Sequence, residues 1–438
     1  MTSKEKIIAA VDIGTTKIVS IVGRRNEKNK LEILGLSKTV SKGVKRGVVL
    51  NIEETVSAIR STLIEVQEQA AVSLKDAFVG IAGQHIKSIR NRGYLNRDSY
   101  ETEITKEDIQ VLINDMYKIP IDAGEEIIHV LPQNFIVDNE TGIKNPVGMS
   151  GKRLEGNFYI VIGKIASANN IEKCINRAGL NVQELILEPL ASSEAVLTED
   201  EKEAGVALID IGGGTTDIAV YYDNVIRHTA VIPFGGNVVT NDIKEGCSIL
   251  GRQAEQLKVQ FGSALGDLAN EDKVVTIPGI SGREPKEISF KSLAYIIQSR
   301  MEEILDAAMF EVESSGMKEK LSAGIVITGG GALLKHLPQL VKFRSGLDVR
   351  IGYPNEHLAA NCMEEVNQPM YATSVGLLLK GFEHVEKNEK RKEVRVEQNN
   401  VEQEQEPVQT PSKPRYGIFA NLKDKINNIF EEDDTVME

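Results

Sequence analysis

The sequence contains little cysteine and no apolar run long enough to cross a membrane. Its three cysteines, Cys174, Cys247 and Cys362, are widely spaced, so they predict neither a disulfide framework nor a metal-ligand cluster and suit a reducing compartment. No apolar run reaches the ~18 residues that a spanning helix needs, and the polar start Met1–Lys6 is unlike a signal peptide. We therefore expect a cytosolic chain that does not cross a membrane.

The sequence also lacks an excess of positive charge and a P-loop. With 64 acidic against 51 basic residues its formal net charge is -13, which argues against nucleic acid as the main partner. No Gly-x-x-x-x-Gly-Lys-Ser/Thr stretch occurs, which excludes a P-loop fold. The 438 residues exceed the ~250 to 300 that one hydrophobic core supports, so we expect at least two lobes.

What the sequence does contain is a glycine-rich turn that occurs twice. Asp12-Ile-Gly-Thr-Thr-Lys17 and Asp210-Ile-Gly-Gly-Gly-Thr-Thr-Asp217 each follow one apolar strand and lead into another. In such a turn the glycines let backbone N–H groups approach an anion, the threonine hydroxyls add donors, and the carboxylate requires a cation beside it. Two such turns facing each other predict a site that holds a polyphosphate.

A third glycine cluster completes the predicted site. Ile325–Gly331 is an apolar strand that runs into Gly329, Gly330 and Gly331, and residues 332–335 are expected to begin a helix. A backbone without side chains at the start of a helix can accept a base or an α-phosphate closely. Glu255 and Lys258, three residues apart on a predicted helix, are either paired ribose-binding groups or an exposed ion pair.

Apolar strands alternate with amphipathic helices along most of the chain, which predicts an α/β fold. The predicted strands are Ile7–Val11, Ile18–Val22, Ala77–Ile81, Ile160–Ile162, Val206–Ile211 and Ile325–Ile327, and the predicted helices include Ile52–Gln69 and Ile288–Met309. From Glu386 to Arg415 the chain has no aromatic residue and is rich in Glu, Gln, Lys, Asn and Pro. We expect this segment to be a disordered linker, since it cannot bury enough apolar surface to offset the entropy of ordering.

Residues 416–432 predict a terminal amphipathic helix. Its apolar side chains fall within an arc of roughly 120° and comprise Ile418, Phe419, Leu422, Ile426, Ile429 and Phe430. The segment is too short to span a bilayer and is separated from any core by the linker, so we expect an interfacial helix on anionic lipid. The acidic end Glu431–Asp434 would keep binding moderate and reversible. The alternatives are a helix that folds back onto the body or docks on another protein.

The order of the three glycine turns resembles the superfamily of actin, sugar kinases and heat-shock chaperone ATPases, whose two lobes close over Mg-ATP. Within it, the chain resembles the FtsA family of bacterial cell-division proteins over all but the linker. The stretches that carry this resemblance are Ile127–Phe135, Asp138, Ile143–Gly151 and Arg153–Glu155 for an extra subdomain, Glu188–Glu194 for a connecting helix, Tyr371–Leu377 for a closing helix, and Gly417–Leu422 for a membrane-targeting segment.

The resemblance implies a two-lobed actin-like (ribonuclease-H-like) ATPase fold with an inserted subdomain. The implied parts are a first lobe at 1–83 and 165–200, the insert at 84–164, a second lobe at 201–234 and 311–385, its outer subdomain at 235–310, the linker at 386–415 and the amphipathic helix at 416–432.

The resemblance also implies roles for the residues of the turns. Asp12 and Asp210 would hold Mg²⁺ through water, because this ion dehydrates reluctantly. The predicted nucleotide-binding residues are Asp12, Gly14, Thr15, Thr16, Lys17, Asp210, Gly212, Gly213, Gly214, Thr215, Thr216, Asp217, Gly236, Asn237, Glu255, Lys258, Gly329, Gly330 and Gly331. Glu188, or else Glu194, would orient a water for hydrolysis, although a glutamate at a helix start also suits the helix dipole. We expect ATP binding with weak or no hydrolysis.

The implied partners are protein and membrane. Arg300 and Glu303, on the outer face of 235–310, are candidates for binding the C-terminal peptide of FtsZ, although they could equally be solvated helix residues. The family likeness further implies an actin-like filament of the chain with itself, other division proteins at the insert, and peripheral attachment to the cytoplasmic side of the inner membrane at the division site. A small-molecule kinase of the superfamily and a pilus-assembly adaptor are the alternatives, and neither explains the terminal helix.

Overall fold

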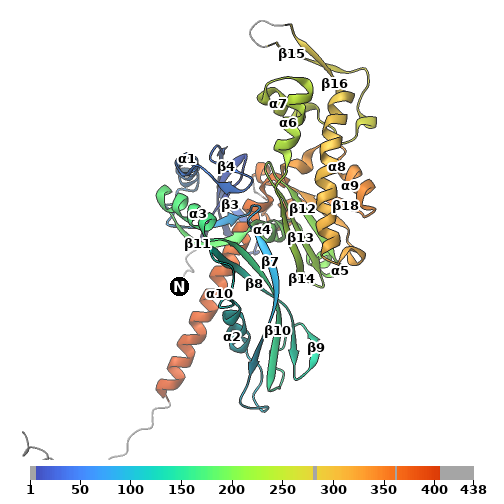
Figure 1. Cartoon of the computed structure of the whole chain (residues 1–438). Coiled ribbons are helices and arrows are strands. Elements are labelled where there is room, and N and C mark those ends of the chain that lie inside the picture. Colours follow the sequence, from blue (N-terminus) through green and yellow to red (C-terminus); the bar gives the residue numbers. More distant parts are fainter. Residues whose placement is uncertain (1–5, 280–283, 361–362, 405–438) are drawn as a thin grey trace, which may run out of the picture. The chain divides into compact units, whose positions relative to one another are not determined.

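The computed structural model describes residues 6–279, 284–360 and 363–404. The chain divides into two units, residues 1–385 and 386–438, and the boundary falls where the composition changes. All the sheets described below belong to the first unit (Figure 1).

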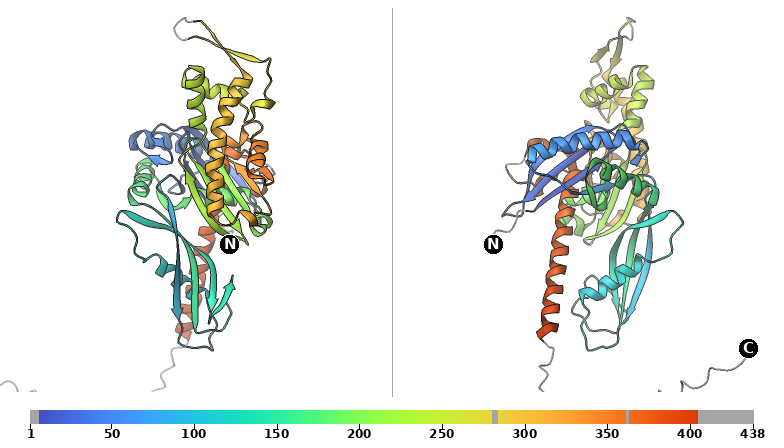
Figure 2. Two further views of the ribbon diagram at one scale, coloured as in Figure 1. Left: turned by 45° about the vertical axis from the view of Figure 1, so that its right-hand side comes forward. Right: turned by 90° about the vertical axis from the view of Figure 1, so that its left-hand side faces the viewer.

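The first lobe is built on a five-stranded sheet of order β11-β6-β1-β2-β3. Its strands are β1 (Ile7–Ile13), β2 (Lys17–Arg25), β3 (Leu31–Val40), β6 (Asp76–Ile81) and β11 (Asn181–Leu187). Side chains alternate between the two faces: Ala9 and Val11 of β1 pack beneath α1 (Ile52–Ala70) and α3 (Ile165–Ala178), and Ile8 and Ala10 face the other way. Figure 2 shows α1 and α3 together over this sheet.

The second lobe repeats this arrangement with a sheet of order β14-β13-β12-β17-β18. Its strands are β12 (Val206–Ile211), β13 (Thr216–Tyr222), β14 (Val225–Ile232), β17 (Ile325–Thr328) and β18 (Val349–Ile351). As with β1 and β2, β12 and β13 form an antiparallel hairpin, and β12 pairs in parallel with β17. Helices α8 (Phe290–Ser314) and α9 (Leu337–Ser345) pack on one face.

Two helices fill the space between the sheets. α4 (Glu188–Val196) and the start of α10 (Ala372–Glu404) share one core with the inner faces of both sheets. They cross at Gly376, where an added Cβ would lie 1.8 Å from the carbonyl oxygen of Ala191. Only glycine permits this approach. The turns that end β1 and β12 therefore meet beside these two helices.

An inserted subdomain lies between β6 and α3 in the sequence and has a sheet of its own. Its strand order is β7-β10-β8-β9, and its elements are β7 (Lys87–Asn96), α2 (Lys106–Met116), β8 (Glu125–Val137), β9 (Glu140–Ile143) and β10 (Arg153–Lys164). Leu112 of α2 is buried against Phe135 and Phe158 of the sheet. The extra subdomain expected from the sequence is thus present.

The outer part of the second lobe is mostly helical. It contains α6 (Gly236–Cys247), α7 (Gly251–Phe261), the hairpin β15 (Val274–Ile277) and β16 (Lys286–Ser289), and the first turns of α8 (Figure 1). The first unit also contains two short elements. One is a hairpin of β4 (Val44–Lys45) and β5 (Val48–Val49), and the other is the helix α5 (Glu199–Ala204). Among the residues described, no helix is long and apolar enough to cross a membrane.

Two expectations require correction. Residues 386–404, expected to be disordered, are helical as the second half of α10, because Glu, Lys, Arg and Gln favour a helix and extending a packed helix avoids the cost of nucleation. Residues 332–335 do not begin a regular helix: a 3₁₀ turn spans Gly330–Leu333 and α9 begins at Leu337. The rest of the linker and the predicted helix at 416–432 lie outside the described residues.

Candidate functional site

The two repeated turns face each other at close range. A Cβ atom added to Gly213 would lie 2.2 Å from Cγ2 of Thr16, and one added to Gly214 would lie 2.4 Å from Oγ1 of Thr15. Both contacts are far below van der Waals distance, so these positions require glycine. Thr15 is itself held in place, because its Oγ1 accepts a 3.1 Å hydrogen bond from the backbone N–H of Gly47. The predicted opposition of the two turns is present in the structure.

Beside the turns, one buried aspartate comes from each sheet. Asp12 and Asp210 are 5% and 7% exposed. Ser374 donates a 2.9 Å hydrogen bond to Oδ2 of Asp12. Asp210 accepts at Oδ2 from the hydroxyls of Ser192 at 2.6 Å and Thr373 at 3.3 Å. None of these three hydroxyls was expected from the sequence, and all come from α4 and α10.

Two further carboxylates make this region strongly acidic. Burial, followed by the charges of Asp12, Asp217 and Asp210, raises the pKa of Glu188 well above its ordinary value. Burial and the neighbouring Asp210 likewise raise the pKa of Asp217. One oxygen of Asp217 accepts a 3.1 Å hydrogen bond from Thr215, and the other is buried without a hydrogen-bond partner. Such a cluster favours a bound cation, which would relieve the repulsion.

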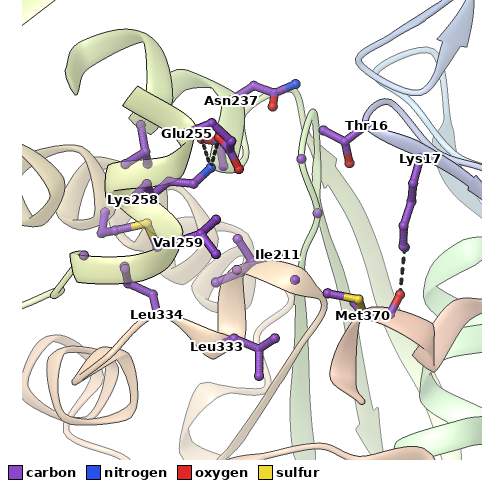
Figure 3. Close-up of a pocket in the computed structure, with 18 of the residues that line it drawn as sticks. Thr16, Lys17, Ile211, Asn237, Glu255, Lys258, Val259, Leu333, Leu334 and Met370 are labelled. Carbon is purple, nitrogen blue, oxygen red and sulfur yellow. Dashed lines mark hydrogen bonds and ion pairs between the residues drawn. The ribbon is translucent and has the colours of Figure 1, made fainter. Parts of the chain in front are cut away.

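Lys17 is a cation whose charge acts on this cluster. Its Nζ donates a 2.8 Å hydrogen bond to the carbonyl oxygen of Met370 (Figure 3). The same atom lies 5.7 Å from the ring centre of Tyr371. Its charge lowers the pKa of Glu188 and of Asp210, against the effect of burial. Within the described part of the chain, no three acidic, histidine or cysteine side chains are placed to hold a metal ion together.

A cavity of about 340 Å³ opens beside the second turn. Figure 3 shows Thr16 and Lys17 on one side of it and Glu255 and Lys258 on the other. The predicted residues that line it are Thr16, Lys17, Gly212, Gly213, Gly236, Asn237, Glu255, Lys258, Gly330 and Gly331. The lining residues that sequence reasoning missed are Ile211, Val239, Val259, Gly262, Met301, Leu333, Leu334, Lys335 and Met370. Most of these are apolar, and they suit a flat base.

Glu255 and Lys258 belong to the cavity. On α7 their side chains form a 2.8 Å ion pair. Nζ of Lys258 also donates to the carbonyl oxygen of Gly236 at 3.0 Å and to Oγ1 of Thr240 at 2.8 Å. These contacts direct Lys258 at the start of α6, and the binding of a ribose by the pair stays a prediction.

The remaining predicted residues do not line the cavity. They lie in or behind the turns and comprise Asp12, Gly14, Thr15, Asp210, Gly214, Thr215, Thr216, Asp217 and Gly329. Gly329 has a φ of +81°, and a Cβ there would lie 2.3 Å from Oδ1 of Asp210. The third glycine turn therefore packs closely against Asp210, and this approach requires glycine.

Of the two candidate glutamates, only Glu188 belongs to the acidic cluster. It is the first residue of α4, and its carboxyl lies against Gly80, where an added Cβ would be 3.1 Å from Oε1. Glu194 instead pairs with Lys202 at 3.4 Å and Lys380 at 3.1 Å. Although burial opposes ionisation, these lysines lower the pKa of Glu194 to about 2. The structure does not bring Glu194 to the site, because it lies almost two turns along the helix.

Arg300 and Glu303 lie apart from this site, on α8. Arg300 forms ion pairs with Asp242 of α6 and with Glu303. Asp242 raises the pKa of the Arg300 guanidinium further. The pair joins two helices of the outer subdomain at a half-exposed position, and its part in binding a partner stays a prediction.

Two family models match the chain. One, described as cell division protein FtsA, matches residues 207–376, and the other, an SHS2 domain inserted in FtsA, matches residues 83–162. The cell division protein FtsA of Pseudomonas aeruginosa is 40% identical over 86% of this chain and 90% of its own length. That of Escherichia coli K12 is 35% identical over 89% of this chain and 94% of its own length.

Solved structures with a similar fold are more distant in sequence. A PilM-PilN type IV pilus biogenesis complex superposes with a TM-score of 0.60 at 15% identity, covering 85% of this chain and 98% of its own. MreB 5 of Spiroplasma citri bound to AMPPNP gives a TM-score of 0.51 at 16% identity, covering 89% and 99%. These likenesses concern the fold alone and confirm the actin-like architecture predicted from the sequence.

Proposed function

The chain belongs to the FtsA family of cell division proteins, and we propose that in this role it binds Mg-ATP between its two lobes. We further propose that it polymerises on itself and tethers FtsZ to the cytoplasmic face of the membrane. The proposal of ATP binding rests on one observation. The two glycine turns lie opposite each other at close range, at the edge of a cavity with an apolar lining. A small-molecule kinase or a pilus adaptor is disfavoured by the family to which the chain belongs.

The residues at the cavity suit the phosphates, the ribose and the base of a nucleotide in turn. Backbone N–H groups of Gly213 and Gly214, with the hydroxyls of Thr15 and Thr16, would hold phosphate oxygens. Glu255 and Lys258 would bind the ribose. The base would lie on the apolar lining, which includes Val259, Met301 and Leu334. MreB 5 of Spiroplasma citri, which has a similar fold, binds AMPPNP, and this supports the proposal that the present chain binds a nucleotide.

The acidic cluster fits a divalent cation. Mg²⁺, when bound, would neutralise the charge of the phosphates and of Asp12 and Asp210 together. The buried, unpartnered oxygen of Asp217 and the raised pKa values of Asp210 and Glu188 support this assignment, because each shows that a carboxylate is costly to ionise here without a cation beside it. Coordination through water agrees with the small number of side chains at hand.

In this proposal Glu188 would orient a water. In the ligand-free protein its raised pKa favours the protonated acid, which is a poor acceptor for a water proton. Its carboxylate would become available only when a cation lowers that pKa. We propose ATP binding with weak or no hydrolysis, in which nucleotide would govern filament formation through closure of the lobes.

The nucleotide part is tested by calorimetric titration of the full chain with ATP in the presence of Mg²⁺. We expect saturable binding with one ATP per chain, and about tenfold weaker binding for Lys258→Gln, the loss of one charged hydrogen bond. The matched control is Lys291→Gln, a lysine of α8 outside the cavity that pairs with Glu271. An absence of binding, or equal affinity in both variants, would contradict the proposal.

The membrane part rests on the sequence of residues 416–432. It is tested by sedimentation of the full chain with anionic liposomes and a peptide of the FtsZ tail. Phe419→Glu with Phe430→Glu should leave the protein in the supernatant, whereas Asn427→Glu with Asn428→Glu adds the same charge on the polar face and should pellet. An intact chain that stays soluble would make the segment a protein-docking element.

A further inference from the structure

Adjacent residues of one helix hold the two site aspartates, which belong to different sheets. Thr373 and Ser374 occupy the first turn of α10. Thr373 bonds Asp210 of β12, and Ser374 bonds Asp12 of β1. Ser192 of α4 bonds Asp210 as well, and its hydroxyl lies 2.9 Å from that of Thr373. These hydroxyls therefore link the two lobes through the carboxylates themselves.

The hydrogen bonds are made to one oxygen of each carboxylate. All three go to an Oδ2 atom. The Oδ1 atoms turn towards the glycine turns: that of Asp12 is 3.9 Å from where a Cβ of Gly14 would be, and that of Asp210 is 2.3 Å from the corresponding point at Gly329. A carboxylate held at Oδ2 can rotate little, so the direction of its second oxygen is fixed as well.

The same stretch of chain makes a third contact with the site. Lys17 of the first turn donates its hydrogen bond to the carbonyl oxygen of Met370, three residues before Thr373. Residues 370–374 are thus attached at three points to groups that would contact phosphate or cation. Val375 and Leu378, which follow, are buried in the core between the sheets. The start of α10 is therefore fixed both to the site and to the core.

We infer that Thr373 and Ser374 are positioning residues, which set Asp210 and Asp12 for a divalent cation and make the start of α10 respond to its binding. This rests on the proposed Mg-ATP site. If these hydroxyls position the aspartates for a cation, removing them lowers ATP affinity only when Mg²⁺ is present. If they only satisfy buried carboxylates, removing them has the same effect with and without Mg²⁺. The two cases differ in a measurable quantity, the gain in ATP affinity on adding Mg²⁺.

The test uses the full chain and the substitutions Thr373→Val and Ser374→Ala, singly and together. ATP affinity is measured in Mg²⁺ and in EDTA. In Mg²⁺ we expect the double variant to bind ATP about tenfold more weakly, which corresponds to the loss of one well-placed contact to a charged group. In EDTA we expect its affinity for ATP to fall less than twofold. Thr373→Ser, which keeps the hydroxyl, should restore most of the loss.

Ser193→Ala is the matched control. Ser193 is as buried as Ser192 and lies on the same helix, but it donates to the carbonyl oxygen of Pro189 at 2.6 Å and not to a carboxylate. It should leave the Mg²⁺ effect unchanged. Hydrogen exchange at residues 370–377 is a second readout, and adding Mg-ATP should slow it in the wild type and change it less in the double variant.

The outcomes separate the inference from the proposed function. If the wild type binds no ATP in Mg²⁺, the proposed function fails and this inference fails with it. If the wild type binds and the variants lose equal affinity with and without Mg²⁺, or lose none, the positioning role is wrong while the proposed function stands. Thermal unfolding of each variant shows whether it is folded. If the double variant does not fold, the titrations of the two single variants provide the test.

Discussion

The backbone N–H of Leu187 donates a 3.0 Å hydrogen bond to Nε2 of His129. His129 lies in β8 of the inserted subdomain, and Leu187 immediately precedes Glu188 at the start of α4. Because Nε2 is the acceptor, the ring is neutral with its proton on Nδ1. Burial, and then the charge of Lys380, lowers the pKa of His129 to about 4. The insert thus holds the first turn of α4, which carries the glutamate of the acidic cluster.

We predict that His129→Phe destabilises the protein. The substitution leaves the N–H of Leu187 buried without its acceptor, which costs about 1 to 3 kcal/mol of unfolding free energy. Denaturant unfolding at pH 7 measures this loss. His129→Gln is the control, because its amide oxygen can accept the same bond and should retain part of the stability. Equal loss in both variants would show that ring packing, and not the hydrogen bond, matters.

The same histidine predicts a dependence of stability on pH. Its pKa is about 4 in the folded protein and near 6.5 when exposed, so between these values the unfolded chain binds more protons. Stability should therefore rise with pH across this window and fall as the pH drops from 6.5 to 4. The slope should be smaller in His129→Phe. An unchanged slope would mean that His129 is not the group responsible.

Glu188→Gln should stabilise the ligand-free protein at neutral pH. The pKa of Glu188 is raised on folding, so the folded state holds a proton that the unfolded state releases above about pH 4.5. Each pH unit between the two pKa values costs about 1.4 kcal/mol, and an amide avoids that cost. We expect a gain of about 1 kcal/mol or more at pH 7 in EDTA, measured by thermal unfolding, which shrinks at pH 4.5. Glu68→Gln, at an exposed position of α1, should show no gain.

Glu194→Gln should have the opposite effect. The pKa of Glu194 falls to about 2 on folding, so its ion pairs stabilise the protein above pH 4.5, and this contribution disappears as the pH falls towards 2. Removing the charge leaves the buried Lys202 short of a partner, and we expect a loss of about 2 kcal/mol at pH 7. The exposed Glu199 pairs with the same lysine, and Glu199→Gln should cost less than about 1 kcal/mol. Equal losses in the two variants would contradict this assignment.

Gly213→Ala should prevent the two turns from approaching. The added Cβ would overlap the side chain of Thr16, and overpacking of this kind costs about 1 to 3 kcal/mol. ATP affinity should fall with it. The double variant with Thr16→Ala removes two of the three overlapping atoms and should recover part of the stability, a coupling that a double-mutant cycle measures. Gly251→Ala, where the nearest atom would be 3.9 Å away, should have little effect.

Sequence reasoning located the site because its main elements are local in sequence. The turns at Asp12 and Asp210 could be recognised in the sequence because glycine and threonine occur in them at a fixed spacing. The structure brings the two turns together. The groups that support them gave no such signal. Ser192, Thr373 and Ser374 are ordinary helix residues in the sequence, and only the packing of α4 and α10 between two sheets places their hydroxyls against carboxylates.

Two other features could not be read from composition. Val259 and Met301 line the cavity, but an apolar residue of a binding site looks the same in sequence as one of the core. Residues 386–404 lack the apolar side chains of a core, and for that reason the sequence predicted disorder. They form a helix nevertheless, because they continue a helix that has already begun in the folded unit.

Glu194 was a candidate for catalysis because of its residue type and its place on a predicted helix. In the structure it forms ion pairs with two lysines that are distant in the sequence, and it does not reach the site.

A crystal structure of the full chain with Mg²⁺ and a non-hydrolysable ATP analogue would test the proposed nucleotide site directly. We predict phosphate density between Thr16 and Gly213, a hydrated ion near Asp12 and Asp210, and the base beside Val259. Nucleotide density elsewhere, or a nucleotide at this place with its phosphates away from the two turns, would contradict it.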